Sequence, residues 1–107
     1  MTATDFSSSR FSFRQTILVK HDHPSLSGHF PNNPIVPGVV ILDQVMRLWQ
    51  QKTNKHIQQI NHTKFVNLLR ADISYIIHYK EKNEQKIDFL IMDDSQKIIA
   101  KGLFSYV

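Results

Sequence analysis

The stretch from residue 39 to residue 53 limits the fold of this chain most, because its apolar side chains cover most of a helical circumference. These apolar residues are Val39, Ile41, Leu42, Val45, Met46, Leu48 and Trp49. A helix with this pattern is expected to be buried on nearly all sides. Much of the remaining chain has the pattern of strands, so a curved sheet is the element available to wrap it. The sequence therefore predicts an α+β fold, with a long buried central helix wrapped by a curved antiparallel sheet.

Strand patterns lie on both sides of this helix in the sequence. The runs with strand character are residues 11–20, 57–66, 73–80, 86–92 and 97–107. Polar turns at 81–85 and 93–96 separate the last three runs. The predicted order is one strand, a loop, the helix and an antiparallel meander. A chain of 107 residues is expected to form a single domain, 1–107, with the polar, Ser-rich residues 1–10 as a loose lead-in.

Composition and charge exclude several classes of protein. The chain has no cysteine, so disulfides and thiolate metal sites are excluded. Its 13 basic residues give a net charge of +4 but are scattered, which argues against nucleic-acid binding. No run reaches the roughly 18 apolar residues of a membrane span, and no signal-peptide pattern is present, so we expect a cytoplasmic protein. His21, Asp22 and His23 are too closely spaced for a tetrahedral metal site, and we predict no metal.

The segment from residue 21 to residue 38 is predicted to be a structured functional loop. It contains all four prolines and two of the three glycines of the chain. Proline fixes its own φ and restricts the residue before it, so the backbone around His29 has little freedom. A histidine held in one place is a candidate general base. The alternative is a purely structural role, which is the commoner one for a lone histidine in a proline-rich loop.

Two further groups near the start of the helix complete a candidate site. The backbone N–H of Gly38 is placed to stabilise negative charge on a carbonyl oxygen, because helix N-termini carry free donors and a positive dipole end. Asp43 lies in the second turn of an otherwise apolar stretch, where burial would favour the protonated carboxyl and make it a candidate acid. The alternative is a solvent-facing aspartate. A base, an oxyanion donor and an acid are what β-elimination of water from a 3-hydroxyacyl thioester requires.

These residues resemble the loop of the FabA/FabZ family of 3-hydroxyacyl-acyl-carrier-protein dehydratases. The family pattern is approximately H-F-P-x-x-P-[IV]-[MV]-P-G, with an acid fourteen residues after the histidine. The nine matching positions are His29, Phe30, Pro31, Pro34, Ile35, Val36, Pro37, Gly38 and Asp43.

The resemblance implies a hotdog fold and dehydration of 3-hydroxyacyl chains bound to an acyl carrier protein, giving trans-2-enoyl thioesters without a cofactor. It assigns His29 as base, Asp43 as acid and the Gly38 N–H as oxyanion donor, with the remaining loop positions shaping the site. Arg47, one turn after Asp43, is also expected to shape the site. It also implies a homodimer, with His29 of one chain facing Asp43 of the other. Compact relatives act in polyketide and aryl-polyene synthesis as well as in fatty-acid-like pathways.

The chain departs from the family pattern at several positions. Arg47 stands one turn after the acid, where the family usually has glutamine, and a cation there favours the carboxylate form. Arg70, Ala71 and Asp72 replace the usual Pro-Gly-Asp turn. Two alternatives therefore stand beside the dehydratase. One is a hotdog thioesterase, and the other is a non-catalytic acyl-binding or partner subunit.

Overall fold

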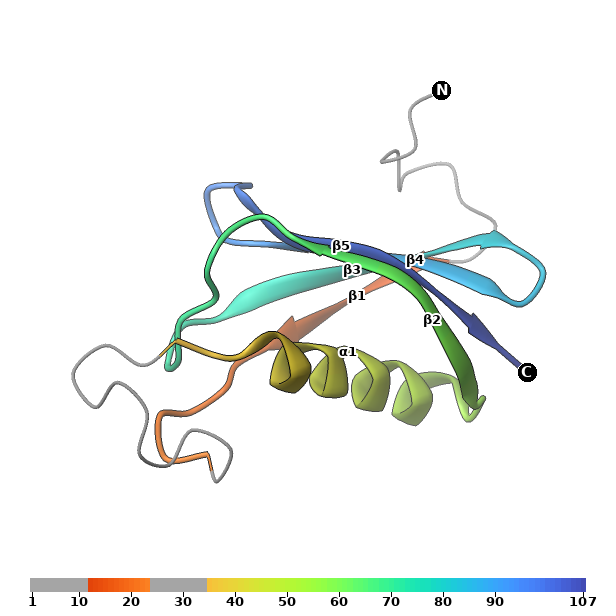
Figure 1. Ribbon diagram of the computed structural model, residues 1–107, viewed down its shortest axis with the longest axis horizontal. Helices are drawn as coiled ribbons and strands as arrows, with labels where there is room; N and C mark the ends of the chain where they lie inside the picture. Colours follow the sequence, from red (N-terminus) through yellow and green to blue (C-terminus); the bar gives the residue numbers. More distant parts are fainter. Residues whose placement is uncertain (1–11, 24–34) are drawn as a thin grey trace.

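The computed structural model describes residues 12–23 and 35–107 of the chain. Within these residues, a single helix packs on one face of a five-stranded sheet (Figure 1). The elements are β1 (Ser12–Ile17), α1 (Gly38–Thr53), β2 (Ile57–Phe65), β3 (Tyr75–Asn83), β4 (Lys86–Met92) and β5 (Ile98–Tyr106). The predicted α+β class is confirmed, and each predicted element exists with its ends moved by a few residues.

The order of strands across the sheet is β1-β3-β4-β5-β2, and all neighbours are antiparallel. The last three strands form the expected meander. The prediction was wrong for β2, which pairs with β5 at the far edge instead of lying beside β3. The long connection from residue 66 to residue 74 crosses the sheet to make this possible, and β1 takes the place beside β3. Both edge strands therefore come from the first two thirds of the chain.

Alternation along the strands places one row of side chains beneath the helix. Tyr75, Ile77 and Tyr79 of β3 are buried while their neighbours Ile76 and His78 are only partly so, as expected for a sheet with one covered face. The same alternation buries Ile87, Phe89 and Ile91 of β4. These residues form the core together with the buried side of α1.

The helix is fixed to the sheet by aromatic side chains. Trp49 is buried, and its ring meets Phe104 edge-on at 5.3 Å and Tyr106 in a tilted arrangement at 4.9 Å between centroids. The hydroxyl of Tyr79 donates a hydrogen bond to the carbonyl oxygen of Val45 at 2.6 Å. Aromatic pairs of this kind stabilise the fold by more than the apolar area that they bury. The hydrogen bond from the Tyr79 hydroxyl fixes the position of the helix along the sheet.

The burial of α1 is narrower than the sequence predicts. Its buried residues are Val40, Ile41, Val45 and Trp49, which lie on one face. Val39 is 75% exposed, and Leu42, Met46 and Leu48 are only partly buried. The reason is that the sheet covers the helix from one side, as Figure 1 shows, and does not close around it. A single chain thus leaves much of the apolar surface of its helix uncovered.

The end of the helix and the two hairpin turns contain residues with positive φ. Asn54 ends α1 in the left-handed region at φ 59°, with its N–H donating to the carbonyl of Gln50 at 2.8 Å. Gln85 and Gln96 take positive φ at the two hairpin turns. Among the residues that the structure describes, no helix is long and apolar enough to cross a membrane.

Candidate active site

The start of α1 is where the sequence predicts an oxyanion donor. Pro37 caps the helix in an extended conformation, and its carbonyl accepts hydrogen bonds from the N–H groups of Val40 at 3.0 Å and Ile41 at 3.1 Å. Within the described residues, the N–H groups of Gly38 and Val39 donate to no backbone acceptor. Among the residues that the structure describes, they are donors without a backbone acceptor at the positive end of the helix dipole, which is the kind of group that an oxyanion site needs.

The end of the predicted loop is attached to the connection between β2 and β3. Ile35 forms an isolated antiparallel bridge with Arg70, and the N–H of Val36 donates to the carbonyl of Leu69 at 2.9 Å. Val36 is 3% exposed, so its side chain anchors this attachment in the core. The residues immediately before the helix are therefore held by neighbouring backbone as well as by proline.

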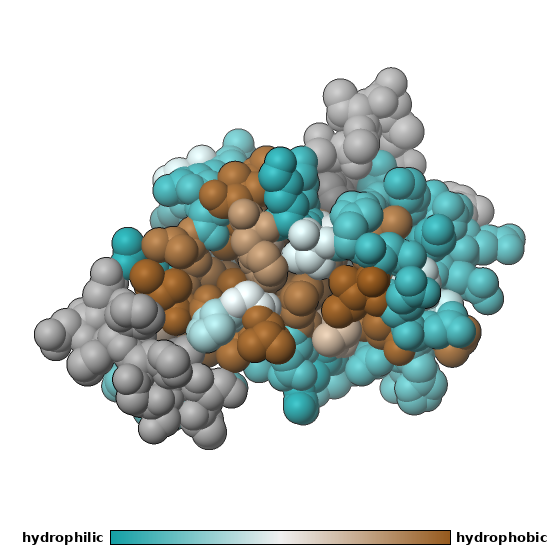
Figure 2. Space-filling view, in the orientation of Figure 1, coloured by the Kyte–Doolittle hydropathy of each residue, from teal (hydrophilic) through white to brown (hydrophobic). Residues whose placement is uncertain are grey.

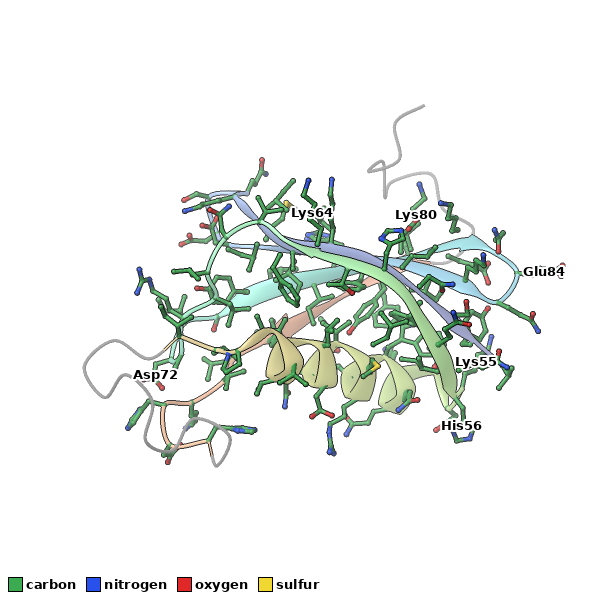
Figure 3. All side chains as sticks on the ribbon, in the orientation of Figure 1. Lys55, His56, Lys64, Asp72, Lys80 and Glu84 are labelled. Atoms are coloured by element: carbon green, nitrogen blue, oxygen red, sulfur yellow. The ribbon has the colours of Figure 1, made fainter. Side chains whose placement is uncertain are left out.

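The beginning of the same loop is attached to the same connection by an aspartate. Asp72 accepts hydrogen bonds from the His21 backbone N–H at 3.0 Å and pairs with His21 Nδ1 at 2.9 Å (Figure 3 labels Asp72). The backbone bond from His21 is the main reason why the pKa of Asp72 lies below its usual value. Asp72 also takes φ 65°, and its N–H donates to the carbonyl of Val19 at 2.8 Å. This is the altered Arg70–Asp72 turn, and it joins both ends of the loop.

Several predicted site residues lie outside the described residues of the chain. These are His29, Phe30, Pro31 and Pro34. Their predicted roles stay predictions, and the site can be built only from its other side, which comprises the helix start and the helix itself.

Asp43 is not in the apolar surroundings that the sequence suggested. Its side chain is 49% exposed, and its Oδ2 accepts a hydrogen bond from Nε of Arg47 at 2.8 Å. The reason is its position on the helix, away from the face that buries Ile41 and Val45. The carboxylate and the guanidinium are one turn apart, which is the spacing that brings such pairs together. Within the single chain Asp43 is an ion-paired surface residue.

An exposed apolar surface adjoins the helix start. It consists of Val39, Phe65, Val66 and Leu68, which are 75%, 44%, 48% and 58% exposed, and we call it the helix-start patch. The Phe65 ring lies so close to Gly38 that a Cβ at that position would be 2.8 Å from its Cζ. Figure 2 shows apolar side chains gathered in the middle of this face of the molecule.

A glycine at a helix start can let a ligand approach the backbone closely, because it has no Cβ. In the structure the close approach is made by Phe65, a residue of the same chain. The two positions are far apart in the sequence, and no local pattern connects them. The contact exists because β2 ends beside the start of α1, which only the topology of the sheet reveals.

Comparison with known proteins identifies the family. A model of ApeI-like proteins, described as ApeI dehydratase, matches residues 6–103, which is most of the chain. The chain belongs to the ApeI-like dehydratase family. No curated protein matches the sequence.

Solved structures show the same fold as this ApeI-like chain. One is described as the dehydratase heterocomplex ApeI:P from Xenorhabdus doucetiae, with TM-score 0.75 and 18% identity over 94% of this chain and 90% of the other. An uncharacterized protein from Erwinia carotovora subsp. atroseptica gives TM-score 0.74 and 20% identity over 90% and 82% of the two chains. At these identities the likeness concerns the hotdog-like architecture, which agrees with the fold implied by the proline-rich motif.

Proposed function

We propose that this chain dehydrates 3-hydroxyacyl thioesters on an acyl carrier protein to trans-2-enoyl thioesters, in fatty-acid-like, polyketide or aryl-polyene synthesis. The observation that carries the proposal is the nine-position motif from His29 to Asp43, which lies inside the segment matched by the dehydratase family. The N–H groups of Gly38 and Val39, which have no backbone acceptor in the described part of the chain, support it, because developing charge on the thioester oxygen needs such donors.

In this proposal His29 removes the proton from C2 while the Gly38 N–H stabilises the thioester oxygen. Asp43 then protonates the departing 3-hydroxyl group as water leaves. A proton donor must carry its proton, whereas the Arg47 guanidinium at 2.8 Å stabilises the ionised carboxylate. The proposed mechanism therefore includes a second chain that covers Asp43 and changes this pairing when the site assembles.

The second chain is proposed to be another copy of this one. Two features of the single chain support an interface beside the site. The helix-start patch is apolar and exposed, and β2 is a sheet edge of nine residues with most of its side chains exposed. Edges of this kind pair readily with another strand. Pairing there would bring a partner to the helix start.

Two observations favour a second candidate function. The Xenorhabdus structure is described as a heterocomplex, and the Asp43–Arg47 ion pair is unfavourable for an acid. The alternative is a partner subunit that binds acyl chains without dehydrating them and pairs with a different, catalytic chain.

A single assay separates these functions. The purified protein is incubated with a 3-hydroxyacyl thioester on a carrier protein, and the products are followed by mass spectrometry and by thiol release. Loss of water supports the dehydratase, free thiol identifies a thioesterase, and neither product favours the non-catalytic subunit.

Two variants and their controls locate the chemistry. His29→Ala is expected to abolish dehydration, whereas His56→Ala, which changes an exposed histidine after the helix, is expected to leave it unchanged.

Asp43→Asn should lower kcat by far more than Asp94→Asn in an exposed turn. A loss under about tenfold, equivalent to roughly 1.4 kcal/mol of barrier, would mean that Asp43 only positions the substrate. Full turnover by a folded His29→Ala protein would contradict the assignment.

A further inference from the structure

A cavity of about 320 Å³ lies at the end of α1 that is remote from the candidate active site. It opens between the last helical turn and the ends of β3, β4 and β5. Its lining residues are Trp49, Lys52, Thr53, Lys55, Glu81, Ile87 and Tyr106. Gly38 and Thr53 are separated by about 22 Å along the helix, given a rise of about 1.5 Å per residue. Figure 3 shows Lys55 and Asp72 near opposite ends of the helix.

The inner wall of the cavity is apolar and rigid. Trp49, Ile87 and Tyr106 are 1%, 1% and 7% exposed, so most of each side chain is already packed in the core. Ring contacts of Trp49 with Phe104 and Tyr106 hold this wall in place. A small apolar body entering the cavity would meet preformed aromatic and aliphatic surface, which is typical of ligand sites of this size.

The rim of the cavity is positively charged. Lys52 and Lys55 are both exposed, and Nζ of Lys55 lies 4.8 Å from the centroid of the Tyr106 ring. Glu81 is the one acidic residue of the lining. Its carboxylate accepts a hydrogen bond from the Tyr106 hydroxyl at 3.0 Å, which holds it beside the Tyr106 ring. In the described part of the chain, neither lysine takes part in an ion pair. Nζ of Lys52 lies 6.0 Å from the centroid of the Phe13 ring, on the β1 side of the cavity. The lining thus has two lysines and one carboxylate that already accepts a hydrogen bond.

One buried polar atom of the wall is also unsatisfied. The indole N–H of Trp49 has no acceptor among the described residues, although the atom is fully buried. A buried donor without a partner costs about 1–3 kcal/mol.

We propose that this cavity binds a small amphipathic carboxylate, with its apolar body against Trp49 and Ile87 and its carboxylate between Lys52 and Lys55. A simpler explanation of the lysines is that Lys52, in the last turn, complements the negative end of the helix dipole. That explanation gives no reason for an apolar cavity next to the charge, and it predicts no preference for anions. The proposal is independent of the chemistry at the helix start.

The single tryptophan of the chain makes the test direct. Trp49 gives the only indole N–H signal in a ¹H–¹⁵N spectrum of the full-length protein. Titration with octanoate is expected to shift this signal saturably. Octanamide, which has the same length without the charge, and octylammonium are expected to bind at least about tenfold more weakly.

Charge-matched variants identify the site. Lys52→Gln and Lys55→Gln should each weaken octanoate binding by several-fold, and the double variant by more. Lys97→Gln, which removes an exposed lysine in the turn between β4 and β5, should have no effect. Melting temperatures of all variants establish that they are folded.

Three outcomes would overturn the proposal. The first is the absence of an indole shift up to the solubility limit of octanoate. The second is equal binding of octanoate and octanamide, which would mean that the cavity binds apolar chains without recognising the carboxylate. The third is equal weakening by Lys55→Gln and Lys97→Gln, which would mean a diffuse response to net charge.

Discussion

The hydroxyl of Tyr79 is a buried polar group with one defined task. It donates to the Val45 carbonyl at 2.6 Å, and its residue is fully buried between α1 and the sheet. Burial raises the pKa of Tyr79 well above its usual value of 10.0, because the phenolate would lose its hydration. The folded chain therefore keeps this proton at a pH where the unfolded chain releases it.

Tyr79→Phe is expected to change both stability and its pH dependence. Near pH 8 the variant should lose about 1 kcal/mol of unfolding free energy, the usual contribution of one hydrogen bond. In the wild type, the unfolding free energy should fall as pH rises above about 10, because the unfolded state alone ionises there, by at most about 1.4 kcal/mol per pH unit from this group. The variant should lack this component. Urea unfolding at pH 8 and pH 11 measures both effects, and parallel pH curves for the two proteins would contradict the second.

The Asp43 pair shows what can be predicted about single residues. The spacing of Asp43 and Arg47 predicts their ion pair, because residues four apart on a helix are neighbours. The exposure of Asp43 was not predictable, since it depends on which side of the helix the sheet covers. The Phe65–Gly38 contact was equally inaccessible, because it follows from strand order and not from local pattern.

At the scale of elements, Gly102 determines how closely β2, β5 and β4 approach. A Cβ on this residue would lie 2.6 Å from the His62 carbonyl oxygen and 2.6 Å from Cε2 of Phe89. Both neighbours are fixed, one as backbone of β2 and the other as a core ring. Glycine is thus required here by packing and not by an unusual φ.

Gly102→Ala is therefore expected to destabilise the fold by about 1–3 kcal/mol, the range typical of overpacked cores. Chemical denaturation followed by circular dichroism measures this loss. Lys101→Ala, on the adjacent exposed position of the same strand, serves as the control and should change stability by less than about 0.5 kcal/mol. Equal effects of the two substitutions would mean that the strands move apart easily.

The elements themselves were largely predictable, but their pairing was not. Alternation in β3 and β4 and the apolar run of α1 indicated their positions within a few residues. The place of β2 was mispredicted because nothing within Ile57–Phe65 says which strand it joins. Its two register shifts against β5 are likewise not indicated by the sequence, since no local pattern in the strand marks them.

At the scale of the whole molecule, the proposed homodimer makes activity depend on assembly. Ile60 is 38% exposed on the edge strand β2, and a lysine there would place a charge on the surface proposed to pair. Ile60→Lys is expected to shift the protein from dimer to monomer at equal concentration and to reduce dehydration in proportion. Light scattering after size-exclusion chromatography measures the first effect, and the thioester assay measures the second.

Leu18→Lys provides a control at an exposed apolar position after β1, on the other edge of the sheet. It should leave both the dimer and the turnover intact. A wild type that is monomeric at micromolar concentration would contradict the homodimer, and a monomeric Ile60→Lys protein with full turnover would contradict a site shared between chains.

The strand order also determines how this sheet can assemble in time. The β3–β4 and β4–β5 pairs join segments that are adjacent in the sequence, whereas β1 reaches β3 and β2 reaches β5 across large loops. Closing large loops has a high entropic cost, so local pairs are expected to form earlier in folding. The meander would then be the folding nucleus, and β2 would dock late. The strand proposed to pair with a partner, β2, is therefore expected to join the sheet last. Its edge then becomes available for pairing with a second chain only after the core beneath it has formed.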